Sequence, residues 1–369
     1  MQIPFIDLKT QYKVLKTSID QRIQKVLDHG AYINGPEVVE LEQALQKFTG
    51  SPFAIACANG TDALLLPLMS LGIKTGDEVI TTAFSFIATA EVIVLAGATP
   101  VYIDIDPITF NMNVSQLEKA ITSKTKAIMP VSLYGQISDM DEINAIAKKH
   151  GLAVIEDAAQ SFGAQYKNKK SCNTSDFAGT SFFPAKPLGC YGDGGAIFTQ
   201  NENHYKAMKE IREHGSEKRY YHTRIGINAR LDSIQCAVLL AKLERYDWEV
   251  KQRDVLAQKF NSEFATLESK GLVIPKVKSD RVSVWAQYTV RVPKRDEFQK
   301  KLTELGVPSS VHYPTIMPDQ PAYKALAGDT SKLFEARKAA SEVISLPLYP
   351  DMTEEVQSAI VERVKKALT

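Results

Sequence analysis

The sequence contains few cysteines and no long hydrophobic run. Its 369 residues include four cysteines, which are widely scattered and form no CxxC or His/Cys metal spacing. This small number and wide spacing of cysteines is typical of buried thiols in a reduced cytosol rather than of a disulfide framework. No apolar run approaches the length of about 18 residues that a membrane span needs, and the first residues lack a basic stretch followed by an apolar one. We therefore expect a cytoplasmic protein with no membrane partner and no bound metal.

The sequence also lacks an excess of charge of either sign. Lys and Arg number 44 and Asp and Glu number 43, which leaves a net charge of +1. The protein therefore has no strong overall electrostatic field that would attract nucleic acid, although its net charge does not exclude a local basic site. Hydrophobic residues make up 44% of the chain and charged residues 24%, which allows a large globular core. At about 150 residues per domain, the length favours two or three domains, or a large domain with a smaller one.

Short apolar runs alternate with amphipathic stretches through the first two-thirds of the chain. Strands are expected at residues 54–57, 78–81, 100–103, 127–131 and 153–155. Helices are expected between them, at residues 61–71, 87–96, 114–121 and 140–150. Gly72, Gly97 and Gly151 come directly after three of these helices, where C-terminal glycines are expected. This alternation predicts an α/β fold with a mostly parallel sheet that helices cover on both faces.

The chain changes character beyond residue 230. From residue 231 to about 267, apolar positions recur at helical spacing and predict one long helix that bridges to the last third of the chain. Residues 283–292 are strand-like, and helices are expected at residues 296–305 and 333–343. We therefore predict a large α/β domain over residues 1–254 and a small C-terminal α+β domain over residues 255–369.

An aspartate and a lysine carry the sharpest chemical signal. Asp157 comes directly after a buried strand, at the carboxyl end where open α/β sheets place their ligands. Lys186 lies in an apolar, glycine-bounded turn, where burial lowers the pKa of its amine and makes it a usable nucleophile. Pyridoxal phosphate chemistry needs such a lysine for its Schiff base and a carboxylate beside the pyridine nitrogen. Each residue alone is more often structural, but the pair in this order favours the functional interpretation.

A phosphate group needs a cradle of its own. Residues 59–64, Asn-Gly-Thr-Asp-Ala-Leu, lie where a strand gives way to a helix. Gly60 lets the backbone approach a ligand, and helix N-terminal amides together with the Thr61 hydroxyl can hold a dianion. The alternative is an ordinary helix cap by Asn59 or Thr61.

With these motifs, the whole chain resembles the DegT/StrS-type sugar-nucleotide aminotransferases. The matching segments are residues 5–8, 35–38, 59–64, 84–90, 156–160, 181–189 and 226–231. The resemblance implies the aspartate aminotransferase fold (fold type I), with pyridoxal 5′-phosphate as cofactor and pyridoxamine phosphate as its amino-carrying form. Finer likeness in residues 130–136, 186–193 and 311–314 is to the members that act on UDP-2-acetamido-2-deoxy-3-oxo-glucuronate.

The resemblance implies a role for each residue that would contact the cofactor ring. Lys186 would form the Schiff base, and Asp157 would pair with the pyridine nitrogen. Gln160 would hydrogen-bond the phenolic oxygen. Phe86 would stack on the ring, a use that its flat face suits, although a lone Phe is normally part of a core.

The resemblance also implies how the cofactor phosphate is held. Gly60, Thr61 and Ser181 would bind it from the same chain. Asn228 would reach it from the other subunit, which implies a homodimer with shared active sites.

Substrate contacts are expected from two further segments. Between residues 212 and 230, five cations are interleaved with tyrosines, and this segment is either a solvated face or an arm that presents cations across the dimer. Arg230 suits a sugar carboxylate because its fork can grip two oxygens. His312 and Tyr313 are expected at the substrate, although His312 could equally be a packing residue. Many relatives carry a second histidine where this chain reads residues 316–320, Ile-Met-Pro-Asp-Gln, which weakens an assignment to 4-keto sugars.

The implied activity is the transfer of an amino group from glutamate, which leaves as 2-oxoglutarate, to the C3 ketone of a UDP-linked keto sugar acid. The product would be a 3-amino sugar nucleotide for surface polysaccharide. One alternative is another keto sugar nucleotide, such as a 4-keto-6-deoxy sugar. A second is sugar dehydration, but relatives of that kind replace the lysine by histidine, so Lys186 argues against it. A third is a cofactor-binding regulator without turnover, against which the complete set of Asp157, Gln160, Ser181 and Lys186 argues.

Overall fold

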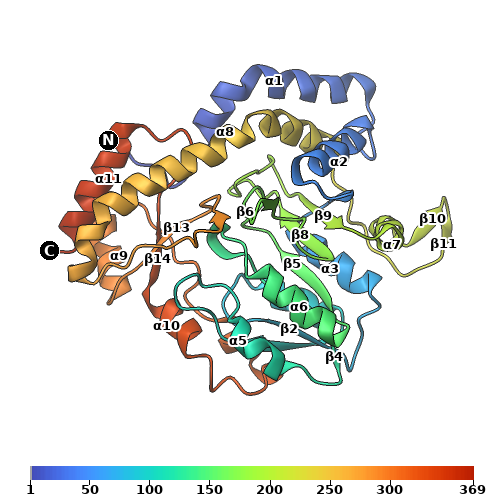
Figure 1. The fold of residues 1–369 in the computed structure, drawn as a ribbon. Helices are drawn as coiled ribbons and strands as arrows, with labels where there is room; N and C mark the ends of the chain where they lie inside the picture. Colours follow the sequence, from blue (N-terminus) through green and yellow to red (C-terminus); the bar gives the residue numbers. More distant parts are fainter. Residues whose placement is uncertain (1) are drawn as a thin grey trace.

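A seven-stranded sheet forms the centre of the computed structural model, which describes residues 2–369 (Figure 1). The strands are arranged in the order β1-β9-β8-β5-β4-β2-β3. Their bounds are β1 (Phe53–Cys57), β2 (Glu78–Thr82), β3 (Thr99–Ile103), β4 (Thr125–Met129), β5 (Ala153–Asp157), β8 (Phe177–Ser181) and β9 (Gly195–Thr199). Strand β9 is antiparallel to β1 and β8, and the other neighbours are parallel. The predicted α/β class with a mostly parallel sheet is confirmed.

Helices cover both faces of this sheet because each strand buries alternate side chains on opposite sides. The helices of this part are α2 (Pro36–Thr49), α3 (Gly60–Ser70), α4 (Ala88–Leu95), α5 (Val114–Leu117), α6 (Met140–His150) and α7 (Glu202–Arg212). Ile155 of β5 packs with α3, α4 and α7, whereas its neighbour Val154 packs with α6. Helix α6 has the predicted bounds, and Gly151 caps it with a left-handed φ of 65°, the conformation expected of a C-terminal glycine.

A 32-residue helix, α8 (Ser233–Phe264), joins the sheet to the last third of the chain. It confirms the long helix expected from residue 231 to about 267. Helix α1 (Leu8–His29) lies along the first half of α8, where Ile19 packs on Val238 and Ala241 (Figure 1). Cys236 and Leu239 of this half also pack in the core beside the sheet. The helix therefore anchors both α1 and the C-terminal part to the sheet.

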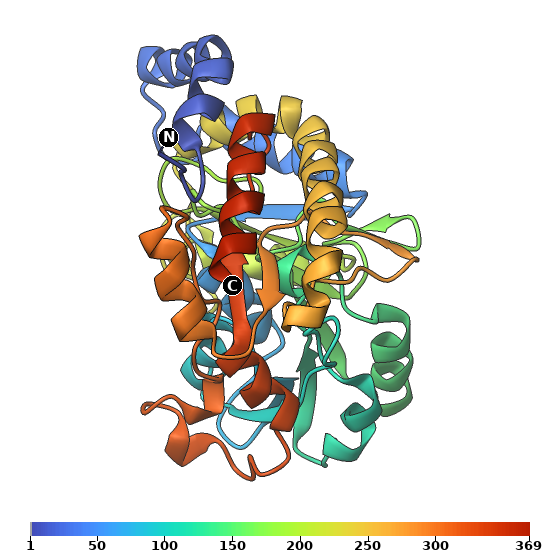
Figure 2. The same ribbon diagram turned by 90° about the vertical axis from the view of Figure 1, so that its left-hand side faces the viewer.

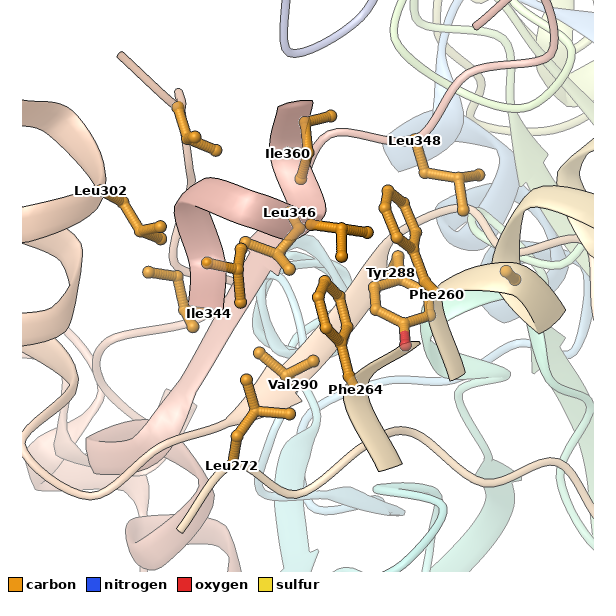
Figure 3. Packing of buried hydrophobic residues seen from close by; sticks show 14 of the residues in the cluster. Phe260, Phe264, Leu272, Tyr288, Val290, Leu302, Ile344, Leu346, Leu348 and Ile360 are labelled. Atoms are coloured by element: carbon orange, nitrogen blue, oxygen red, sulfur yellow. The ribbon is translucent and has the colours of Figure 1, made fainter. Parts of the chain in front are cut away.

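The C-terminal part is built on an antiparallel pair, β13 (Tyr288–Arg291) with β14 (Val343–Leu346). Its helices are α9 (Arg295–Glu304), α10 (Phe334–Glu342) and α11 (Glu354–Ala367). Helix α11 and the second half of α8 lie side by side over this pair (Figure 2). Phe260 and Phe264 of α8 stack with ring centroids 5.4 Å apart, and Tyr288 packs against both (Figure 3). This core includes Leu256 of α8, close to the boundary after residue 254, which stays a prediction.

Two features of the C-terminal part differ from the expectation. Residues 283–292 form a strand only over β13, because Trp285 takes a positive φ of 49° that interrupts the extended backbone. In addition, Met317 and helix α10 pack against Phe84 and Leu133, which belong to the segment that carries the sheet. The last hundred residues therefore contribute to two cores.

Short strand pairings complete the described part of the fold. Strand β6 (Gln165–Tyr166) pairs with β7 (Lys169–Lys170) and β12 (Arg281–Val282). Strand β10 (Ser216–Lys218) pairs with β11 (Tyr221–His222) in a hairpin that projects beside α7 (Figure 1). No helix within residues 2–369 has the length and apolar character to cross a membrane.

Candidate active site

The carboxyl edge of the parallel strands opens onto one cavity of about 490 Å³. The segments after β1, β2 and β4 reach it, as do the ends of β5 and β8, because the carboxyl ends of parallel strands lie at the same edge of a sheet. Nine of the predicted site residues line it: Gly60, Thr61, Phe86, Asp157, Gln160, Ser181, Lys186, His312 and Tyr313. The fold thus brings together residues from most of the length of the chain.

Asp157 is the last residue of β5, and its side chain is held by two donors. Its Oδ2 accepts a hydrogen bond from Thr89 Oγ1 at 2.7 Å, and its Oδ1 accepts one from the backbone N–H of Ala159 at 3.1 Å. Burial raises the pKa of Asp157, while the two hydrogen bonds and the nearby Lys186 act in the opposite direction. The carboxylate therefore faces the cavity in a fixed orientation.

The preceding residue, Glu156, lies on the opposite face of the sheet because side chains alternate along a strand. It is fully buried and accepts hydrogen bonds from the hydroxyls of Ser132, Ser171 and Thr174 and from the backbone N–H of Cys172. All its partners belong to the interior, so Glu156 is structural. Two adjacent acids thus have different roles, set by the face that each occupies.

Lys186 lies in the loop that comes after β8. Its backbone N–H donates to the carbonyl of Phe183 at 2.8 Å, and the N–H of Cys190 donates to the carbonyl of Phe182 at 2.8 Å, which closes the loop at its base. Burial lowers the pKa of the Lys186 amine, and the Asp157 carboxylate opposes this effect. The amine therefore loses its proton more readily than a solvated lysine, as a nucleophile requires.

The N-terminus of α3 brings Gly60 and Thr61 to the cavity. Asn59 caps this helix, since its Oδ1 accepts a hydrogen bond from the N–H of Asp62 at 2.8 Å. A Cβ at Gly60 would lie only 2.7 Å from the Cβ of Ser181, so glycine permits the two segments to approach. The first amides of a helix have no partner inside it, and with the hydroxyls of Thr61 and Ser181 they form a cradle for a dianion. Residues 59–64 therefore form both the helix cap by Asn59 and a cradle that can hold a dianion.

Gln160 is held by two tyrosines. Its Oε1 accepts a hydrogen bond from the N–H of Tyr134 at 2.8 Å, and its Nε2 donates to the hydroxyl of Tyr313 at 3.0 Å. The hydroxyl of Tyr134 donates in turn to the carbonyl of His312. A side-chain amide has two N–H groups, so one of them remains for a ligand. The sheet edge and the C-terminal part therefore meet around this amide.

His312 lines the cavity as an uncharged ring. Its Nδ1 lies 2.9 Å from Ser345 Oγ, and its Nε2 lies 3.4 Å from Ser310 Oγ. Burial, with a smaller effect of Lys186, lowers the pKa of His312 to about 4. The imidazole therefore packs against its neighbours and also lines the cavity.

Two aromatic side chains at the cavity remain half exposed. Phe86 is 54% exposed, and its ring centroid lies 5.9 Å from that of Tyr313. Phe183 is 51% exposed and lines the same cavity. Flat aromatic faces at a cavity are available to stack on a planar ligand, which fits the role expected for Phe86.

Sequence reasoning missed several residues of this site. Thr89 and Tyr134 lie inside segments 84–90 and 130–136, which carry the resemblance, but the sequence assigns neither residue a role. Gln287 has no signal in the sequence. It reaches the cavity from the C-terminal part, and its Oε1 is buried without a hydrogen-bond partner among the described residues.

In the described chain, Asn228 and Arg230 lie outside the cavity. Asn228 is exposed and its backbone bridges to Glu213. An Arg230 terminal nitrogen lies 3.1 Å from Glu213 Oε2, and its Nε is buried without a partner within residues 2–369. The structure holds one chain, so the role of these residues in a shared site stays a prediction.

The cavity suits pyridoxal phosphate by its donor set. It offers an amine of lowered pKa at Lys186 and an oriented carboxylate at Asp157. It also offers a cradle for a dianion, where only a glycine at position 60 lets the segment approach Ser181 so closely. These three groups match three of the polar groups of that cofactor: the aldehyde, the pyridine nitrogen and the phosphate.

Comparison with known proteins identifies the family. A sequence model of the DegT/DnrJ/EryC1/StrS aminotransferase family matches residues 13–365, so the chain belongs to this family. The chain is 53% identical to the UDP-2-acetamido-2-deoxy-3-oxo-D-glucuronate aminotransferase of Pseudomonas aeruginosa, over 94% of this chain and 95% of that protein. It is 44% identical to the pleiotropic regulatory protein of Geobacillus stearothermophilus, over 99% and 98% of the two chains.

Solved structures agree with this family and add the cofactor. S. venezuelae DesV in complex with a ketimine intermediate matches with a TM-score of 0.97 and 36% identity, over 100% of this chain and 98% of that one. Other solved relatives were determined with pyridoxamine phosphate or in a pyridoxal phosphate form. The protein is a pyridoxal phosphate-dependent sugar aminotransferase with the fold of that class.

Proposed function

We propose that the protein transfers the amino group of glutamate to the C3 ketone of UDP-2-acetamido-2-deoxy-3-oxo-glucuronate. The observation that carries this proposal is the 53% identity, over nearly the full length of both chains, to an aminotransferase named for that sugar. The cavity supports it, because the groups that the chemistry needs line one continuous space. The product would be the 3-amino sugar nucleotide, for surface polysaccharide.

Each residue of the cavity would have a separate role in the reaction. When bound, the cofactor supplies an electron sink for the carbon that loses or gains a proton. The Nζ of Lys186 would hold the cofactor and, once the amino group of the donor has displaced it, would be free to move that proton as general base and acid. The carboxylate of Asp157 is oriented by Thr89 and Ala159, and it would keep a positive charge on the ring nitrogen of the bound cofactor. The cradle at Gly60 and Thr61 fixes the phosphate, so that the reacting atoms stay aligned.

The acidic sugar would be recognised by Arg230 from the other subunit of a homodimer. Arg230 has one ion-pair partner within its own chain, Glu213, and its Nε remains unpaired among residues 2–369. A guanidinium with free donors suits a carboxylate, which accepts two parallel hydrogen bonds. Asn228, which is exposed on the same segment, would reach the cofactor phosphate across the same interface.

The test uses purified holoenzyme, glutamate and a panel of keto sugar nucleotides, with products read by mass spectrometry. The panel contains the UDP-3-keto sugar acid, its uncharged 3-keto analogue and a 4-keto-6-deoxy sugar nucleotide. We expect amination of the acid, and 2-oxoglutarate in equal amount. Preferential amination of the 4-keto sugar would overturn the proposed substrate. Absence of amination on every member, with cofactor bound, would also contradict the proposed substrate.

A control experiment tests the amino donor separately from the sugar acceptor. The half-reaction with glutamate alone should convert the cofactor to its amino form and release 2-oxoglutarate. If another amino acid converts the cofactor and glutamate does not, the assignment of glutamate as the donor is wrong. The sugar assignment is then still tested in the second half-reaction.

A further inference from the structure

Lys242 is a buried lysine that no step of the proposed chemistry uses. It lies on α8 and is 1% exposed. Its Nζ donates to the carbonyl of Gly189 at 2.6 Å and lies 4.4 Å from the centre of the Tyr191 ring. No carboxylate of the described residues lies within ion-pair distance of it. An unpaired ammonium is costly to bury, so its contacts with the loop are what offset that cost.

Those contacts fall on the loop that carries Lys186. Gly189 is three residues after Lys186, and the loop doubles back so tightly there that a Cβ at Gly189 would lie 2.6 Å from the carbonyl oxygen of Pro184. The same loop is fastened to α8 a second time, because the N–H of Tyr191 donates to Gln235 Oε1 at 2.8 Å. The loop thus rests on the first half of α8.

We propose that Lys242 is a positioning residue, which holds the loop of residues 183–191 against α8 so that Lys186 stays in reach of its reaction partners. The inference rests on Lys186 as the lysine that bears the cofactor. Lys242 does not line the cavity, so it acts through the loop and does not touch substrate. Its hydrogen bond goes to a backbone carbonyl, so the contact fixes the path of the chain itself.

The groups around Lys242 fit this role. Burial lowers its pKa to about 8, while Glu249 on α8 and Cys190 in the loop favour the charged form. Tyr191, over which the ammonium lies, also packs edge-on against Tyr12 of α1. Even when deprotonated, the amine retains N–H donors for Gly189, so the contact survives above the pKa in weaker form.

The test compares three variants of the holoenzyme. Lys242→Met keeps the length of the side chain and removes the donor. Lys242→Gln keeps a donor without the charge. Lys251→Met, at an exposed lysine on the same helix, is the matched control. We expect kcat of Lys242→Met to fall about ten- to a hundredfold with KM nearly unchanged, because a displacement of about 1 Å can cost that much. Lys242→Gln should recover most of the loss, and Lys251→Met should resemble the wild type.

Two further readouts do not depend on turnover. Backbone hydrogen exchange over residues 183–191 should accelerate in Lys242→Met and return toward the wild-type rate in Lys242→Gln. Borohydride reduction should still attach the cofactor to Lys186, but more slowly. Attachment to another lysine would refute the role of Lys186 and is therefore distinguishable from failure of the present proposal.

The proposal is overturned if Lys242→Met matches the wild type in kcat and in loop exchange. It is also overturned if kcat falls equally in Lys242→Met and Lys242→Gln while loop exchange is unchanged. Should Lys242→Met not fold, Tyr191→Leu takes its place with Tyr191→Phe as control. The loss of the aromatic face should then lower kcat about threefold or more and loosen the loop, and full activity in Tyr191→Leu would contradict the proposal.

Discussion

The cavity at the sheet edge and the segment of residues 213–230 differ in how fully one chain supplies the hydrogen-bond partners of their polar side chains. At the cavity, Asp157 and Gln160 each have two hydrogen-bond partners, and each keeps the capacity for a ligand. On the segment, Asn228 is exposed, and Arg230 combines one ion pair with an unpaired Nε among the described residues.

The difference arises from how each region is built. Parallel strands converge on one edge, so a single sheet can assemble the groups that bind the cofactor. The segment 213–230 is a surface excursion whose hairpin projects beside α7 (Figure 1). Tyr220 is 83% exposed and Ile225 is 86% exposed, and we propose that these apolar side chains are covered in a subunit interface. One region carries the chemistry, and we expect the other to complete the site of a second copy.

The largest effect should come from Lys186→Ala. It removes both covalent attachment and proton transfer, the latter alone worth about 10²- to 10⁴-fold, so turnover should be lost. The cradle at Gly60 and Thr61 remains, and the cofactor should still bind without a covalent link. Borohydride reduction and peptide mapping measure this directly. A reduced adduct on any other lysine of the wild type would show that the role of Lys186 is wrong.

Asp157→Asn should reduce kcat about a thousandfold, since an electrostatic effect of roughly 4 kcal/mol is lost at a preserved shape. Its matched control is Glu156→Gln on the opposite face. That change weakens hydrogen bonds from Ser132, Ser171 and Thr174, so it should lower the free energy of unfolding while kcat of the folded protein changes little. Kinetics and urea unfolding of both variants test the contrast. Near-normal turnover in Asp157→Asn would contradict the role of this acid.

Arg230→Leu tests the segment 213–230 and should weaken recognition of the sugar carboxylate. Losing a charge-assisted hydrogen bond costs about 1.5–3 kcal/mol, so kcat/KM on the sugar acid should fall roughly ten- to a hundredfold relative to its uncharged analogue. Arg224→Leu is the control, because Arg224 lies on the same segment, is half exposed and pairs with Glu210 at 2.6 Å. Equal losses on both sugars would remove Arg230 as the group that reads the carboxylate.

The last prediction concerns stability at acid pH rather than turnover. Burial lowers the pKa of His312 to about 4, whereas an unfolded histidine titrates near 6.5. As the pH falls from about 6.5 to 4, the unfolded chain takes up a proton that the folded chain does not, so stability is lost over that window, by at most about 3 kcal/mol. Urea unfolding of wild type and His312→Gln from pH 7 to 4.5 measures it. The variant should show a shallower loss, and identical pH profiles would contradict the burial of this ring.

Much of the cofactor site could be predicted from the sequence because its residues lie in local motifs at strand ends. Gly60 and Asp157 each come after an apolar run that is typical of a strand, and parallel strands bring such ends together without further information. Lys186 could be found for a similar reason, since it lies in a short turn bounded by glycine.

The rest depends on contacts between distant segments. The hydroxyl of Tyr134 meets the carbonyl of His312, 178 residues away in sequence, and no local pattern reports such a pairing. Gln287 lines the cavity two residues after Trp285, whose positive φ interrupts the expected strand. The pairing of Arg230 with Glu213 likewise could not be predicted from composition, because several acids nearby in the sequence were available as partners.

Mixing two inactive variants tests most directly that the two regions complete each other across a dimer. Lys186→Ala disables the cavity, and Asn228→Asp places a negative charge where we expect the cofactor phosphate of the second copy. After subunit exchange, a shared site predicts that each mixed dimer regains one intact site of two, so activity returns although each parent has none. Activity that stays absent in the mixture, with mixed dimers shown to form, would contradict the account and show that Asn228 does not complete the site of the partner subunit.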